Sequence, residues 1–135
     1  MKIHVETTVS APLARVWEAY NNPADVTKWN FADDSWRCPS AASDLREGGQ
    51  FSARMEAKDG SFGFDFAGTY TKVEPQRRLE YAFGDRNASV DFSEGPNGVT
   101  VAVDFDGDDE HPEDMQRGGW QAILENFKKH VESGK

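Results

Sequence analysis

The sequence is poor in cysteine and has no long apolar run, and each absence excludes a class of protein. Its 135 residues include one cysteine, Cys38, so the chain forms neither an internal disulfide nor a thiolate metal cluster. No segment approaches the ~20 consecutive apolar residues of a membrane-spanning helix. The opening segment MKIHVETTVS alternates apolar and polar residues, unlike a signal peptide. These features are typical of a cytoplasmic protein, and we expect no insertion into a membrane.

Basic residues are also scarce. The chain has 15 Lys and Arg against 24 Asp and Glu, which gives a formal net charge of −9. Binding to nucleic acid or to an anionic membrane requires a clustered basic face, whereas here the basic residues are scattered along the chain. The charge balance therefore argues against nucleic acid as a partner.

Aromatic side chains, by contrast, are plentiful: they make up 12 % of the residues, within a total of 37 % hydrophobic residues. A chain of this length can bury a core without disulfides or metals, so we expect a single domain over residues 1–135. Rings in this proportion favour either a few large core contacts or a cavity that they line.

The first third of the chain predicts one strand and two short helices. Alternation over residues 3–9 predicts the strand. Ser10 is expected to cap a helix with Pro12 in its first turn, and apolar residues then recur on one helical face: Leu13, Val16, Trp17 and Tyr20. Asn22 and Pro23 repeat the cap-and-proline signal, which predicts a second short helix over residues 23–28 that ends beside Trp29.

Residues 35–105 are expected to form about six strands. Short turn signals separate the apolar runs, namely KDGS at 58–61, EPQR at 74–77, FGDRN at 83–87 and EGPNG at 94–98. Turns this short join antiparallel neighbours. Each run has one apolar and one polar face, so the sheet should be covered on one side only.

The end of the chain predicts a long helix that covers this sheet. Pro112 and the acidic residues after it mark its start. Its apolar stripe comprises Met115, Gly119, Trp120, Ile123, Leu124, Phe127 and Val131. Gly118 and Gly119 would leave room next to Trp120. The prediction is an α+β fold: a curved antiparallel sheet of about 6–7 strands, two short helices after strand 1, and a long C-terminal helix over the concave face.

Four segments resemble the signatures of a known family: VSAPLARVWEAYNNPADVTKW, DLREGGQF, GTY…EPQRRLEY and GGWQAILENF. The family is named after the C-terminal domain of the activator of the ninety-kilodalton heat-shock protein's ATPase. It lies in the START-like (SRPBCC) superfamily of helix-grip proteins, with the birch pollen allergen and polyketide cyclases. The resemblance spans Ile3 to Val131. It implies a deep apolar cavity between sheet and helix, which relatives use for lipids, sterols, plant hormones or polyketides.

The resemblance also implies candidate ligand-binding residues. Trp29 would lie near the cavity mouth, and tyrosine and arginine side chains would orient a polar group of the ligand. The full set of candidates is Trp29, Trp36, Met55, Phe64, Tyr70, Tyr81, Arg86, Phe105, Trp120 and Leu124. We therefore expect a monomer that binds a small apolar molecule, of the lipid, sterol, polyketide or flavonoid type, without a cofactor.

Two other functions stay open. One is a protein-interaction module, such as a chaperone partner, that works through the acidic outer face. The other is a cyclase-like enzyme that depends on Tyr81 and Arg86. The sequence contains no His–carboxylate pair, nucleophile elbow or phosphate loop, so it favours binding over catalysis.

The remaining chemistry-bearing residues are expected to be structural. Asp104, Asp106 and Asp108 have the spacing of a calcium loop, but Asp109 stands where glycine is needed and Met115 where a bidentate Glu belongs. We interpret this stretch as a strand end followed by an acidic helix start. The three histidines, His4, His111 and His130, lack metal-site spacing and are expected on the surface. Cys38 is expected to be a buried structural thiol.

Overall fold

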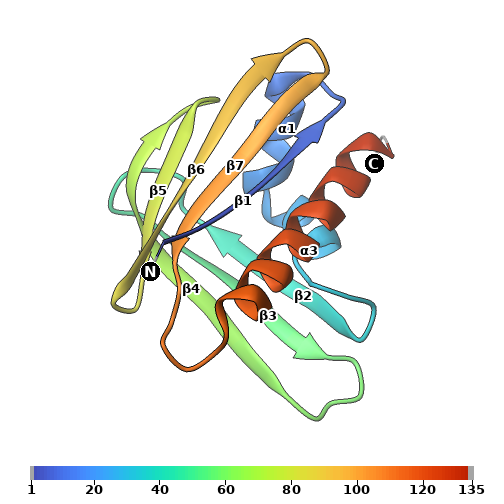
Figure 1. Ribbon diagram of the computed structural model, residues 1–135, viewed down its shortest axis with the longest axis vertical. Helices are drawn as coiled ribbons and strands as arrows, with labels where there is room; N and C mark the ends of the chain where they lie inside the picture. Colours follow the sequence, from blue (N-terminus) through green and yellow to red (C-terminus); the bar gives the residue numbers. More distant parts are fainter. Residues whose placement is uncertain (1, 134–135) are drawn as a thin grey trace.

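The computed structural model describes residues 2–133, which form one sheet and three helices (Figure 1). In chain order the elements are β1 (Lys2–Val9), α1 (Leu13–Asn21), α2 (Pro23–Trp29), β2 (Trp36–Ser43), β3 (Gln50–Ala57), β4 (Gly63–Glu74), β5 (Arg78–Phe83), β6 (Arg86–Gly95), β7 (Gly98–Asp106) and α3 (Glu113–Glu132). The predicted order of elements is confirmed.

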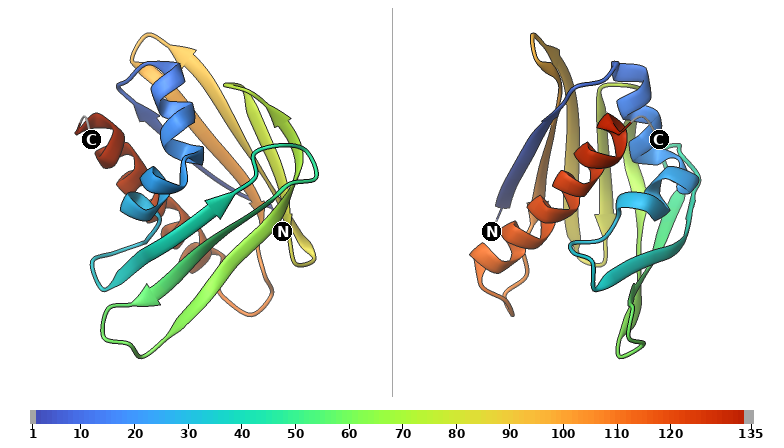
Figure 2. Two further views of the ribbon diagram at one scale, coloured as in Figure 1. Left: turned by 180° about the vertical axis from the view of Figure 1, so that it is seen from behind. Right: turned by 90° about the vertical axis from the view of Figure 1, so that its right-hand side faces the viewer.

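The strands form a single curved antiparallel sheet. Its order is β1-β7-β6-β5-β4-β3-β2, so the first two strands of the chain lie at opposite edges. Helices α1 and α2 connect these edges, and α2 packs against β2. Helix α3 packs against β1, α1 and α2, with the sheet curling around it (Figure 2). The predicted α+β helix-grip architecture is therefore confirmed.

Alternation along the strands determines which side chains enter the core. In β1 and β7 every second residue is buried, and the register pairs Ile3 with Phe105 and Val5 with Val103. These apolar pairs face the interior, where Phe127 of α3 is completely buried against the same core. The period-2 pattern in the sequence thus translates directly into one covered face.

A β-bulge in β4 interrupts this alternation. The register with β5 shifts between Tyr70 and Lys72. As a result the buried Leu79 of β5 pairs with Val73, whereas in an unshifted register it would pair with Lys72. The extra residue changes which side chains face the core: before the bulge these are the even-numbered residues of β4, and after it they are odd-numbered. Val73 therefore packs on the core.

The starts of the short helices differ in one respect from the prediction. Asn22 caps α2 as expected, since its side chain accepts a hydrogen bond from the Ala24 amide at 3.1 Å. Ser10 does not cap α1: the helix begins at Leu13, and Pro12 occupies the cap position without a side-chain hydrogen bond. The Ser10 amide instead donates to Glu132 Oε2 at 2.8 Å, which ties the end of β1 to the end of α3.

Helix α3, at Glu113–Glu132, is shifted by one residue from the predicted range 112–131, and its buried face is shorter than the apolar stripe. Its buried residues, Leu124, Phe127, His130 and Val131, all lie in the second half. Met115, which the stripe placed inward, is 62 % exposed because the first turn of α3 lies outside the packed region. Within residues 2–133 no helix, α3 included, is both long and apolar enough to span a bilayer.

Candidate ligand-binding site

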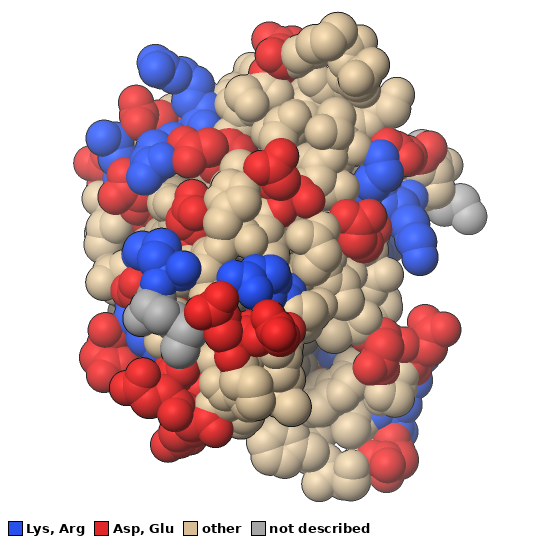
Figure 3. Space-filling model, viewed as in Figure 1, with Lys and Arg blue, Asp and Glu red and all other residues tan. Residues whose placement is uncertain are grey.

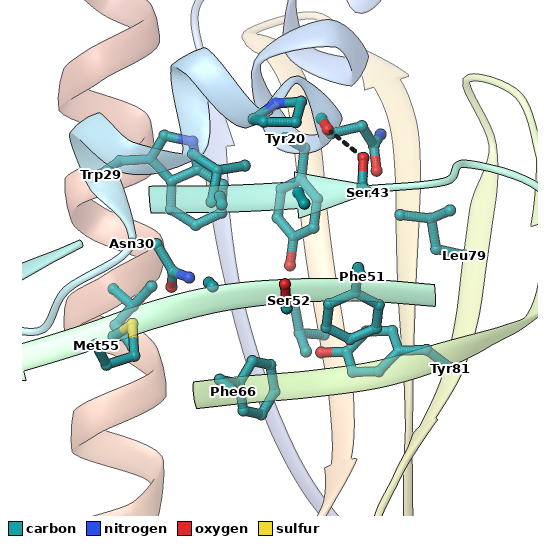
Figure 4. A pocket seen from close by; sticks show the side chains of 18 of the residues that line it. Tyr20, Trp29, Asn30, Ser43, Phe51, Ser52, Met55, Phe66, Leu79 and Tyr81 are labelled. Carbon is teal, nitrogen blue, oxygen red and sulfur yellow. Dashed lines mark hydrogen bonds between the residues drawn. The ribbon is translucent and has the colours of Figure 1, made fainter. Parts of the chain in front are cut away.

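A cavity of about 250 Å³ lies between the curved sheet, α2 and α3 (Figure 4). It is lined by residues from nine elements, because the sheet curls away from the helix instead of packing flat against it. Most of its wall is apolar: Val5, Val26, Trp29, Phe51, Met55, Phe64, Phe66, Leu79, Val103, Trp120, Ile123 and Leu124.

Ring contacts hold this wall in place. Trp120 of α3 stacks on Phe105 of β7, with centroids 3.9 Å apart and planes 9° from parallel. On the opposite side, Phe51 packs edge-on to Tyr81 at 5.0 Å. Aromatic pairs at such distances add to the energy of burial, so the wall is a packed structure with defined positions.

The cavity reaches the protein surface beside β4. Phe64 of β4 lines the cavity and is also 41 % exposed, so it forms part of the rim. The space-filling view shows a hollow on this side of the molecule, with acidic side chains near it (Figure 3). Gly118 and Gly119 of α3 have open space beside them, since no atom lies within 4 Å of a Cβ added to either, but neither glycine lines the cavity.

One polar group of the cavity is already hydrogen-bonded within the protein. Ser43 donates to the Asn21 carbonyl at 3.2 Å and is itself a hydrogen-bond partner of the Tyr70 hydroxyl. Burial raises the pKa of Tyr70 to about 12, with the Ser43 hydrogen bond acting weakly in the opposite sense. Tyr70 therefore stays protonated and tied to Ser43 at neutral pH.

Two further hydroxyls, those of Tyr20 and Tyr81, point into the cavity (Figure 4). Neither hydroxyl makes a hydrogen bond to another residue in the described range 2–133. Both oxygens are accessible through the cavity, since no buried polar atom of these residues lacks a partner. Burial raises the pKa of both phenols above the ordinary value of 10.0. Both are therefore protonated donors that a bound molecule can reach.

Seven of the ten candidate residues line the cavity: Trp29, Met55, Phe64, Tyr70, Tyr81, Trp120 and Leu124. Trp29 belongs to the inner wall instead of the mouth. Its ring is 5 % exposed, packs on Phe127 at 4.9 Å, and donates its Nε1–H to the Ala19 carbonyl at 2.9 Å.

The other three candidates lie outside the cavity wall. Trp36 packs instead against Phe62 and Phe64 near the tip of the β3–β4 hairpin. Arg86 lies over the ring of Phe83 and donates from Nε to the Asp106 carbonyl at 3.0 Å, so the backbone holds it away from the cavity. Phe105 is completely buried beneath Trp120, which separates it from the open space.

Several wall residues were missed, among them Tyr20, Asn30, Phe51 and Phe66. The sequence did contain a signal for some of them. Phe51 alternates with Ala53 and Met55 on one face of β3, and Phe66 alternates with Phe64 on β4. Tyr20 was recognised as apolar-facing, but nothing local distinguishes a ring that borders a hollow from one that fills a core.

His130 corrects the expectation that all three histidines lie on the surface. Its side chain is 6 % exposed, and its Nε2 lies 2.8 Å from Asp25 Oδ1. Arg15 donates to both oxygens of the same carboxylate, at 3.0 and 3.2 Å. One aspartate thus joins α1, α2 and α3. The histidine follows Phe127 by three residues and Ile123 by seven, a spacing that places it on the buried helix face.

The expectations for Cys38 and the acidic stretch fit the structure. Cys38 is 3 % exposed, and burial raises the pKa of its thiol. Asp104 contacts His4, Asp106 pairs with Lys2, and Asp108 accepts from the His111 amide, so each carboxylate has a local partner. His4 and His111 are exposed, as predicted.

Comparison with known proteins gives a consistent answer. A family model described as Activator of Hsp90 ATPase homolog 1-like protein (AHSA1) matches residues 10–132. No curated protein matches the chain. Among solved structures, the AHSA1-like protein from Aeromonas hydrophila is 41 % identical over 99 % of this chain and 94 % of its own, with a TM-score of 0.93.

A second solved structure, Chr148 from Cytophaga hutchinsonii, is 40 % identical over 98 % of this chain and 93 % of its own, with a TM-score of 0.84. Protein NE0264 from Nitrosomonas europaea shares the fold at 18 % identity, covering 100 % of this chain and 96 % of its own, with a TM-score of 0.86. The match over nearly the whole chain and the shared architecture show that this chain belongs to the Activator of Hsp90 ATPase homolog 1-like family, within the helix-grip superfamily.

Proposed function

We propose that this protein binds a small, largely apolar molecule in the cavity between the sheet and α3. The observation that supports this most directly is the cavity itself, about 250 Å³ in volume, with a mostly apolar wall and a few inward hydroxyls. This combination of apolar wall and sparse polar groups is characteristic of small-molecule sites. A core that served stability alone would gain by closing the space, because unfilled volume forfeits packing contacts.

The size of the wall bounds the affinity. A ligand that buries about 200 Å² of apolar surface, as an aromatic side chain does, gains roughly 5 kcal/mol from leaving water. Hydrogen bonds add to this, and lost motion subtracts from it. We therefore expect dissociation constants between about 1 μM and 1 mM, a range suited to titration by nuclear magnetic resonance.

Filling the cavity should weaken binding without disturbing the fold. Ala41 lies on the edge strand β2, is only partly buried and lines the cavity, so Ala41→Phe places a ring in the space at low risk of strain. We expect the neutral probe N-phenyl-1-naphthylamine to bind the wild-type protein and to bind Ala41→Phe at least about 10-fold more weakly. Amide chemical shifts titrated with the probe give both constants.

The matched control is Phe62→Ser. Phe62 is 59 % exposed and absent from the cavity wall, so its replacement should change probe affinity less than about 2-fold. Equal binding of the probe to wild type and Ala41→Phe would contradict the proposal. So would shifts that cluster at the hairpin tip rather than around the cavity.

A second candidate function is binding of a partner protein, which an exposed ring cluster favours. Trp36, Phe62 and Phe64 contact one another at centroid distances of 5.9 to 6.1 Å. Exposed apolar patches of this kind mark interaction sites, and the family description names an Hsp90 chaperone as the relevant class of partner.

The same two variants test this second candidate with the opposite outcome. If the cluster docks a chaperone, Phe62→Ser should weaken binding to a purified Hsp90 by about 10-fold while Ala41→Phe leaves it unchanged. Calorimetry with the two purified proteins makes the measurement. Absence of binding at tens of micromolar, or equal binding by all three variants, would exclude the cluster as a docking surface for this partner.

A further inference from the structure

The charge of the cavity wall restricts what it can hold. Among residues 2–133, the side chains that line the cavity include no Lys, Arg, His, Asp or Glu. Arg86, the cation expected to orient a carboxylate, is held outside the wall by the Asp106 carbonyl. A charged group moved into such a space would lose its hydration without gaining a counter-ion, which costs several kcal/mol. Fatty acids, other carboxylates and amines are therefore poor occupants.

The volume restricts the size of the occupant. At about 250 Å³, the cavity lies just below the ~300–1,000 Å³ typical of sites for drug-sized ligands. Its walls are also defined by packed rings, such as Trp120 held flat on Phe105, so they resist expansion. A compound of one or two fused rings suits this space, whereas a four-ring skeleton exceeds it.

The free hydroxyls define where the polar end of the occupant lies. Tyr81 is 7 % exposed, and its hydroxyl has no partner among the described residues. Tyr20 reaches the same space from α1, and both hydroxyls point into it (Figure 4). Tyr70 is already engaged by Ser43. The cavity leaves the Tyr20 and Tyr81 hydroxyls accessible, and an acceptor on the ligand would receive hydrogen bonds from both phenols.

We propose that the occupant is an uncharged compound of one or two fused rings that carries a hydrogen-bond acceptor, such as a ketone, and that this acceptor receives hydrogen bonds from the hydroxyls of Tyr20 and Tyr81. The inference rests on the proposed function and specifies its ligand class. The apolar rings of the ligand then lie against Phe66 and Trp120.

A matched ligand series tests the proposal on the wild-type protein. The three probes 2-acetylnaphthalene, 2-ethylnaphthalene and 2-naphthoate have nearly one shape but present an acceptor, no polar group and a negative charge. We expect 2-acetylnaphthalene to bind about 10-fold more tightly than 2-ethylnaphthalene, because the ethyl compound has no hydrogen-bond acceptor. At pH 7 2-naphthoate should bind at least about 100-fold more weakly than 2-acetylnaphthalene. Its affinity should rise about 10-fold for each unit from pH 7 to pH 5, because only the neutral acid enters.

Variants locate the acceptor site. In the double variant Tyr20→Phe with Tyr81→Phe, the preference for 2-acetylnaphthalene over 2-ethylnaphthalene should fall from about 10-fold to about 1-fold, while 2-ethylnaphthalene binds at least as well as before. Phe62→Ser should keep the full preference. Amide spectra of each variant establish that it is folded, and the wild-type ligand series decides the question of charge independently.

The outcomes separate the two proposals. If 2-ethylnaphthalene and 2-acetylnaphthalene bind equally, the apolar site stands and the assigned acceptor contact falls. Tight binding of 2-naphthoate, or of the four-ring ketone progesterone, would likewise overturn the assigned ligand class while leaving the cavity as a binding site. If no neutral compound of the series binds and N-phenyl-1-naphthylamine also fails to bind, both proposals are wrong.

Discussion

Replacing Asp25 with alanine is expected to lower the free energy of unfolding by about 3–5 kcal/mol, because breaking a buried ion pair leaves its partners uncompensated. The carboxylate of Asp25 is 11 % exposed and accepts hydrogen bonds from Arg15 of α1 and His130 of α3. A domain of this size has about 5–15 kcal/mol of stability in total, so the variant should lose a large share of it. Urea unfolding at pH 7 measures the loss.

The control for this prediction is Glu18→Ala. Glu18 also contacts Arg15, at 2.9 Å, but its side chain is 62 % exposed, so its pair should contribute less than about 1 kcal/mol. The Asp25 cluster is Asp25 with Arg15 and His130. If the two variants lose equal stability, burial of this cluster does not explain the loss in Asp25→Ala.

The Asp25 cluster should also make stability depend on acid pH. Burial acts to raise the pKa of Asp25, but the hydrogen bonds from Arg15 and His130 outweigh it, and the net pKa lies below the ordinary value of 3.8. A carboxyl with a lowered pKa stabilises the fold above its unfolded pKa, and the stabilisation is lost as the pH falls through the folded pKa. The stability gap between wild type and Asp25→Ala should therefore narrow from pH 5 to pH 2.5. A constant gap would contradict this.

Replacing Phe105 with alanine should cost about 3–5 kcal/mol for a different reason, namely the hole left in a packed core. Phe105 is completely buried and lies directly beneath Trp120, with 3.9 Å between ring centroids. Because Trp120 lines the cavity, loss of its support should also weaken binding of the naphthalene probes. Urea unfolding and probe titration measure the two effects.

Met115→Ala is the comparison for Phe105→Ala. Met115 was predicted on the apolar helix face that covers the sheet, yet it is 62 % exposed. Its truncation should change stability by no more than about 0.5 kcal/mol. A large loss in Met115→Ala would mean that the first turn of α3 is packed in solution, and a small loss in Phe105→Ala would mean that the core relaxes around the missing ring.

The fold could be predicted almost completely from the sequence, because most elements have a local sequence pattern that indicates them. Alternation marks β1 and β7, the turn at 94–98 requires Gly98 at a φ of 128°, and the stripe through Leu124 and Phe127 marks α3. The errors were at positions where local signals are ambiguous. Ser10 is a good cap residue, but Pro12 lies closer to the first helical turn.

The candidate site could be predicted only in part. Tyr81 and Trp120 were assigned correctly to the wall, since both occupy apolar faces of elements that surround the cavity. Phe105 occupies an equally apolar face, and no local feature reveals that another ring covers it. That these residues bind a ligand stays a prediction, which the naphthalene series addresses.

The sequence by itself determined the elements, their order and the face that each turns inward, because period-2 and period-3.6 patterns record which side of a strand or helix leaves water. Only the tertiary structure decided which inward side chains pack against one another and which line the cavity. That outcome depends on sheet curvature, on the bulge after Tyr70 and on contacts such as Asp25 with His130, whose partners lie 105 residues apart. Curvature and long-range contacts are properties of the assembled chain, and no local pattern encodes them.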